Sequence, residues 1–239
     1  LYAKGRQLRT FDIGLTVIGR ELPPPAEWNY YLDLWQHPAA VARVEGLDMW
    51  SDAHFEALVP YMRLLADAGQ KVVTTTLNKD PWNNQCFDSY ADMIVWTKNA
   101  DGAWSYDYTV FDRWVELMTG LGIDHTINCY SMLPWNNELH YRDGVTGRFV
   151  DVTADPGTPA FEELWVPFLT DFTGHLREKG WLGRTNIAMD ERSPEEMTDA
   201  LDLLRKTAPE LGIAMADNKN SYLSYPFINS MCVKVRDRV

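Results

Sequence analysis

Apolar residues follow two kinds of spacing along this chain. Short β-branched or apolar runs predict strands, and longer segments with apolar residues every three or four positions predict helices. We expect strands over residues 28–34, 71–77, 125–130, 185–189, 213–216 and 231–235. We expect helices over residues 51–69, 108–121, 159–179 and 193–208. Because strands and helices alternate, the pattern predicts parallel strands joined by crossover helices.

Two predicted hairpins interrupt this alternation, one over residues 93–108 and one over residues 140–152. A closed (β/α)8 barrel takes about 250 residues. The chain has 239 residues in all and also contains the hairpins. We therefore predict an α/β fold, a TIM-barrel-type domain that is cut off after about six strands. The alternative is a doubly wound open sheet, although no glycine-rich phosphate loop follows the first strand.

The first 27 residues differ from the rest of the chain. A short apolar piece over residues 11–18 is followed by three prolines, Pro23 to Pro25, which form a stiff extended spacer. We interpret residues 1–27 as the end of a preceding domain with its linker, and residues 28–239 as the partial barrel. The chain begins with Leu1 and shows no signal-peptide pattern. We expect it to be an excised piece that lacks its targeting information.

Composition narrows the class of protein. Hydrophobic residues make up 46% and charged residues 23%, as in ordinary globular proteins. The net charge of −12 argues against nucleic acid as a partner. No apolar run approaches the roughly 20 residues that span a bilayer. The three cysteines are far apart, so we expect free, mostly buried thiols and predict neither a metal site nor a cofactor.

Aromatic residues gather in polar stretches. There are 10 Trp and 11 Tyr, and several lie in loops such as residues 80–84 and 133–137. Aromatic rings beside amides and carboxylates suit sugar rings, although large aromatics also fill cores and interfaces. In a barrel the active site lies at the carboxyl ends of the strands. That rule gives the candidate substrate-binding residues Asp33, His37, Trp82, Tyr130, Trp135, Asn136, Asn137 and Asn218.

The sharpest candidate is Asp190-Glu191, two carboxylates directly after an apolar strand. Two neighbouring acids do not ionise easily together, so one pKa should rise, and a protonated carboxyl can act as a general acid. The alternative is a charge pair at the start of the helix that begins near Ser193.

Neighbouring acids fit the usual two-carboxylate mechanisms poorly, because those place the two groups about 5 to 10 Å apart. They fit the substrate-assisted variant, in which the sugar's 2-acetamido oxygen attacks the anomeric carbon. Glu191 would protonate the leaving group, Asp190 would hold the acetamido N–H, and configuration would be retained. Among other chemistries, the sequence has no GxSxG elbow. Lys79 at a strand end could form a Schiff base, but its polar surroundings argue against it.

Several motifs carry a family resemblance. They are residues 33–38, 50–52, 69–72, 104–108, 130–137 and 188–192. With them, residues 28–235 resemble the catalytic domain of glycoside hydrolase family 123. The resemblance implies a fold similar to that of the family 20 hexosaminidases and a β-N-acetylgalactosaminidase activity. It also implies that Asp190 and Glu191 match the family's Asp-Glu pair.

The same resemblance implies that an N-terminal β-sandwich and the last barrel strands are missing from this chain. It implies a glycan or glycolipid with terminal β-linked N-acetylgalactosamine as partner, and export to the periplasm or exterior of a bacterium. Three alternatives stay open. They are a carbohydrate-binding barrel without activity, a β-hexosaminidase of different sugar preference, and a barrel hydrolase whose nucleophile is Asp33 or Asp217.

Overall fold

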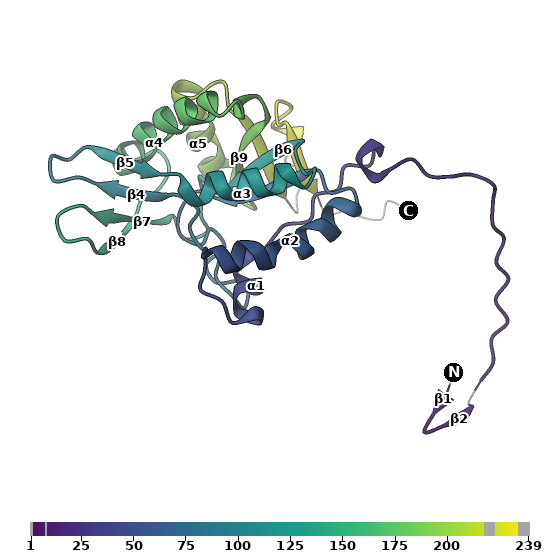
Figure 1. The fold of residues 1–239 in the computed structure, drawn as a ribbon. Coiled ribbons are helices and arrows are strands. Elements are labelled where there is room, and N and C mark those ends of the chain that lie inside the picture. Colours follow the sequence, from purple (N-terminus) through teal and green to yellow (C-terminus); the bar gives the residue numbers. More distant parts are fainter. Residues whose placement is uncertain (1, 8, 218–222, 234–239) are drawn as a thin grey trace.

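The computed structural model describes residues 2–7, 9–217 and 223–233. Its centre is a five-stranded parallel sheet in the order β11-β10-β9-β6-β3 (Figure 1). The strands are β3 (Val72–Thr76), β6 (Thr126–Tyr130), β9 (Thr185–Asp190), β10 (Gly212–Asp217) and β11 (Ser230–Val233). The helices are α1 (Pro38–Glu45), α2 (Asp52–Asp67), α3 (Thr109–Gly120), α4 (Pro159–Glu178) and α5 (Pro194–Thr207). The predicted α/β class is confirmed, with five of its six strands and all four of its helices.

Each strand lies beside the strand that precedes it in this sheet, with no reversal among the described strands. A doubly wound sheet reverses its strand order at a switch point, so that alternative does not fit. The sequential order is the one that a barrel uses. Within the described residues, however, the sheet has two edges, at β3 and at β11, and a closed barrel is not shown.

The expected first strand over residues 28–34 is wrong. Only Leu32 forms a bridge, with Gln70, and the segment runs beside β3 without a backbone ladder. Side-chain amides take the place of that ladder. Gln36 accepts the Thr74 N–H through Oε1 at 2.8 Å and donates through Nε2 to the Val72 carbonyl at 3.1 Å. Because these amides already satisfy the β3 edge, the backbone leaves it and enters the unpredicted helix α1.

The two predicted hairpins are confirmed. The sequence did not predict that they pair with each other to form one sheet. They are β4 (Val95–Lys98) with β5 (Trp104–Asp107), and β7 (Glu138–Asp143) with β8 (Phe149–Thr153). A parallel contact between β4 and β7 joins them into one sheet in the order β5-β4-β7-β8. This second sheet projects from the body of the molecule (Figure 1).

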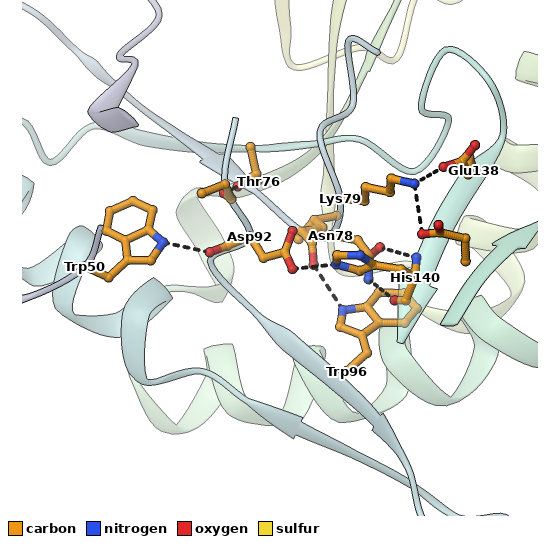
Figure 2. Close-up of polar contacts among 11 residues, drawn as sticks. Trp50, Thr76, Asn78, Lys79, Asp92, Trp96, Glu138 and His140 are labelled. Carbon is orange, nitrogen blue, oxygen red and sulfur yellow. Dashed lines mark hydrogen bonds and ion pairs between the residues drawn. The ribbon is translucent and has the colours of Figure 1, made fainter. Parts of the chain in front are cut away.

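Polar contacts fasten the second sheet to the carboxyl end of β3 (Figure 2). Asn78 donates to the His140 carbonyl at 2.9 Å and accepts the His140 N–H at 2.8 Å. The Trp96 indole donates to the Leu77 carbonyl at 3.0 Å, and the His140 ring pairs with Asp92. These contacts hold the loop after β3, which carries part of the candidate site.

The parallel sheet has two unlike faces. One face is apolar and packs with the helices in the main core; its strand residues are Val73, Ile127, Cys129, Ile187, Met189, Ile213 and Met215. On the other face, Tyr130, Ala188 and Ala214 are neighbours across three strands. Because side chains alternate between faces, Asp190 shares this second face with Ala188.

Two further expectations bear on the rest of the chain. The three cysteines are free as predicted, but only Cys129 is buried, whereas Cys86 and Cys232 are exposed. Residues 9–24 run as an extended stretch away from the sheets (Figure 1). The division of the chain at residue 27 stays a prediction.

The amide contacts at the β3 edge give a first test. Replacing Gln36 by Ala leaves the buried Thr74 N–H without its partner, whereas the Val72 carbonyl keeps the Gln70 amide at 2.7 Å. We expect the free energy of unfolding to fall by about 1 to 3 kcal/mol. Urea denaturation of the intact protein measures this, with Gln85→Ala on an exposed loop as the matched control. An equal, small effect of both changes would contradict the assigned role of Gln36.

Candidate active site

Aromatic rings form a cluster at the carboxyl end of the parallel sheet. Trp82, Tyr90 and Tyr130 are buried, and Trp35 and Trp135 pack against them. The ring centroids of Trp35 and Trp82 are 5.0 Å apart, and those of Trp82 and Tyr130 are 5.1 Å apart. We call these five residues the aromatic cluster. They come from three loops or strand ends, and the small side chains Ala188 and Ala214 of the sheet leave room for them.

Asp190, the last residue of β9, points into the aromatic cluster. It is 8% exposed, and its Oδ2 accepts a hydrogen bond from the Trp82 indole at 2.8 Å. Burial raises the pKa of Asp190 to about 6, against the lowering effect of the Trp82 N–H. The negative charges of Glu191 and Asp217 add smaller increases to this pKa. A carboxyl group with such a pKa titrates in the range where many hydrolases work.

Glu191 lies beside Asp190 in a different environment. Its side chain is exposed, its φ is 49°, and its backbone N–H donates to the Ala216 carbonyl at 2.9 Å. Helix α5 has its own N-cap, Ser193, whose side chain exchanges hydrogen bonds with Glu196 in a capping box. Glu191 therefore precedes the helix, and a role as a helix-start charge belongs instead to Glu195 and Glu196.

Arg192 fastens the turn that carries both acids. Its guanidinium donates to the Trp135 carbonyl at 2.9 Å and to Asn137 Oδ1 at 2.7 Å, and it pairs with Glu196. The amide of Asn137 also donates to Asp155 at 2.9 Å. The side chain of Asn137, predicted to bind substrate, is thus used inside the protein. It connects the loop after β6 to the loop after β9.

Asp33 is half-buried near Tyr130 of the aromatic cluster, and burial raises its pKa to about 6. Its Oδ1 is buried without a hydrogen-bond partner among the described residues. Burial raises the pKa of Cys232 and of Tyr130, and the charges of Asp33 and Asp190 raise both further, so these four groups share one electrostatic environment.

Sequence reasoning did not select Cys232 or Tyr90 for this site. Cys232 reaches it because Ala216 is the register partner of both Asp190 and Cys232. No local motif marks that position, since it follows from strand pairing alone. Tyr90 lies between the rings of Trp82 and His37, with centroid distances of 4.4 and 3.9 Å. For Tyr90, the sequence offered one indication of a role in the site, which is that an aromatic residue lies in a polar loop.

The remaining candidates lie at the margin of the aromatic cluster or beyond it. His37 donates to the Asp88 carbonyl at 2.8 Å and stacks on Tyr90. Asn136 is exposed and lines a shallow depression of about 90 Å³ with Asn83. Asn218 lies outside the described residues. Lys79 forms ion pairs with Glu138 and Asp151 on the second sheet (Figure 2), an environment unlike that of a Schiff-base lysine.

Neither a metal-binding cluster nor a membrane-spanning helix is found among the described residues. No group of three or more His, Cys, Asp or Glu side chains is placed there to hold a metal ion. No helix in the described part of the chain has the length and apolar character needed to cross a bilayer.

Acids and aromatic rings gather at the strand ends of this parallel α/β sheet, an arrangement that suits a glycoside hydrolase. Residues 35–239 match the family model described as glycoside hydrolase 123, catalytic domain. The chain therefore belongs to glycoside hydrolase family 123, as the sequence motifs predict.

A solved structure gives the same result. A family 123 glycoside hydrolase from Clostridium perfringens, analysed for glycolipid glycan hydrolysis, superposes with a TM-score of 0.81 at 32% identity. The match covers 88% of this chain and 39% of that one, so this chain spans well under half of its relative. Comparison with curated proteins gives no match.

The buried carboxyl predicts a stability effect. The pKa of Asp190 rises from 3.8 to about 6, so its ionisation opposes folding as the pH rises through this range. At pH 7.5, Asp190→Asn should raise the free energy of unfolding by about 2 to 3 kcal/mol. The gain should vanish below about pH 3, under both pKa values, where the carboxyl is protonated in both states.

Chemical denaturation of the intact protein at both pH values measures this effect. Asp202→Asn, an exposed change on α5, is the control and should alter neither value. A loss of stability on Asp190→Asn at pH 7.5 would contradict the assigned burial of this group.

Proposed function

We propose that the intact protein is a retaining exo-glycosidase that hydrolyses terminal β-linked N-acetylgalactosamine by substrate-assisted catalysis. One observation carries the proposal: Asp190, the last residue of β9, lies inside the aromatic cluster, and the next residue, Glu191, is exposed beside it. The two environments suit two tasks. A buried carboxylate can orient an amide, whereas an exposed acid can exchange protons with a leaving group and with water.

In the first step, the acetamido oxygen of the sugar attacks the anomeric carbon and the glycosidic bond breaks. Glu191 gives its proton to the departing oxygen. Asp190 accepts a hydrogen bond from the acetamido N–H, which becomes more acidic as the oxazolinium ring forms. The carboxylate thus stabilises charge that develops only in the transition state.

In the second step, water attacks the anomeric carbon from the face that the aglycone has left. Glu191, now ionised, takes a proton from this water, and the ring opens to restore the acetamido group. Two inversions at one carbon leave the configuration retained. We assign Asp33 to a sugar hydroxyl, because its buried Oδ1 has no partner among the described residues.

The preference for the galacto sugar rests on the family resemblance. The relative from Clostridium perfringens hydrolyses glycolipid glycans, and we propose the same substrate class for this protein. We further propose that the sheet closes into a barrel in the intact protein, because the described strands follow one another in sequential order between an edge at β3 and an edge at β11. Export from a bacterial cell is part of the same proposal, and detection of the native protein in periplasmic or extracellular fractions tests it.

The role of Glu191 gives the main test. In the intact protein, Glu191→Gln should lower kcat on 4-nitrophenyl N-acetyl-β-galactosaminide by about 10²- to 10⁴-fold. The loss in the first step should be smaller on the 2,4-dinitrophenyl substrate, whose leaving group needs little protonation. Steady-state and single-turnover kinetics measure both values.

Glu195→Gln is the matched control, an identical change on an exposed residue of the first turn of α5. It should keep the wild-type rate. Full activity of Glu191→Gln would show that Glu191 is not the general acid. An inverted product, followed by nuclear magnetic resonance, would remove the substrate-assisted route.

Participation of the acetamido oxygen predicts a second kinetic signature. Fluorine atoms on the acetyl group withdraw electrons and weaken this oxygen as a nucleophile. The values of kcat/KM should fall steadily from the acetyl to the mono-, di- and trifluoroacetyl substrate. If the rate is independent of fluorination, a protein nucleophile such as Asp33 or Asp217 becomes the better assignment.

A further inference from the structure

We infer that Trp82 is a positioning residue that acts through Asp190. Its indole N–H fixes Oδ2 of the carboxylate, which leaves Oδ1 for the acetamido N–H of the substrate. The sequence predicted Trp82 as a ring that contacts the sugar, and the structure assigns it a different task. This inference rests on the proposed function, because it concerns the group that orients the acetamide.

The burial of Trp82 argues for this task. The residue is only 2% exposed, so its ring has almost no free face for a sugar. The rings of Trp35, Tyr90 and Tyr130 pack around it at centroid distances of 5.0, 4.4 and 5.1 Å. Its single donor, Nε1, points at Asp190 Oδ2 at 2.8 Å. A buried indole N–H with one partner has one preferred orientation.

The loop around Trp82 holds this orientation. Asp80 accepts the backbone N–H of Trp82 through Oδ1 at 3.0 Å and that of Asn84 through Oδ2 at 3.0 Å. The N–H of Trp135 donates to the Pro81 carbonyl at 3.0 Å, which ties this loop to the loop after β6. The indole is therefore fixed at its backbone as well as at its ring.

The other oxygen of Asp190 is in a different situation. Oδ1 accepts no hydrogen bond from the described residues. Among the described residues, the charges of two acids act on Asp190, Glu191 in the following turn and Asp217 on β10, and Asp190 in turn acts on the neutral groups Tyr130 on β6 and Cys232 on β11. The Trp82 N–H is thus the group that favours the ionised carboxylate, and its loss should raise the pKa of Asp190 further.

Replacement of Trp82 by Phe removes the donor and keeps an aromatic ring. In the intact protein, kcat on the 4-nitrophenyl substrate should fall about 10- to 100-fold, with KM changing less. The acid limb of the pH profile of kcat/KM should move to higher pH. The affinity for a thiazoline derived from N-acetylgalactosamine should fall more than that for an iminosugar without an acetamido group.

Trp114→Phe is the matched control. Trp114 is fully buried on the helix-covered side, and its indole donates to the Thr74 carbonyl at 2.9 Å, away from Asp190. This change removes the same group from an equally buried ring, so it tests for general loss of packing. It should lower stability without a shift of the acid limb.

A second variant protects the test against misfolding. Incorporation of 3-(3-benzothienyl)alanine at position 82 replaces the indole N–H by sulfur and keeps the shape of the ring. It should reproduce the kinetic loss and the pH shift. A wild-type pH profile and thiazoline affinity in this variant, with Glu191→Gln still inactive, would overturn the role of Trp82 and leave the proposed function standing. Full activity of Glu191→Gln would instead overturn the function itself.

Discussion

The site depends on one carboxylate held among aromatic rings by a single indole donor. Asp190 lies on the small-residue face of the sheet, and its environment opposes its charge. The Trp82 N–H offsets part of that opposition and fixes the orientation of the group. A carboxylate in such apolar surroundings forms stronger hydrogen bonds with an N–H donor than it does in water. The aromatic cluster therefore controls the charge and the orientation of Asp190 as well as the shape of the site.

The register of the parallel strands makes this arrangement possible. Tyr130, Ala188 and Ala214 stand side by side on one face, and the two alanines leave the space that the larger rings fill. The opposite face carries the branched and long apolar side chains that pack on the helices. Because a strand alternates its side chains, the same short strands can build a core on one side and a site on the other.

Loops that carry site residues are fastened to one another. Arg192 connects the turn after β9 with Trp135 and Asn137 in the loop after β6. Asn78 and Trp96 hold the end of β3 to the second sheet. Such contacts restrict loops that would otherwise move, and a catalytic geometry requires this restriction. The second sheet contributes no strand to the parallel sheet. It supports the site by holding the loop after β3 in place.

The local sequence determined the elements that depend on local physics. The apolar spacing of residues 159–179 and the Ser193-Pro194 start of α5 predicted both helices, because helix ends and periodicity are short-range properties. The runs over β3, β6 and β9 predicted buried strands for the same reason. The Asp190-Glu191 pair was also predicted from the sequence, because two consecutive acids directly after an apolar run form a local pattern.

Tertiary structure decided what depends on partners distant in the sequence. The segment over residues 28–34 has the composition of a strand, but the amides of Gln36 and Gln70 occupy the edge where it would pair. The union of β4 with β7, the place of Cys232 near Asp190 and the bond from Trp82 to Asp190 each join residues more than 30 positions apart. Such contacts arise only when the whole sheet assembles, since no local preference specifies which loop meets which strand.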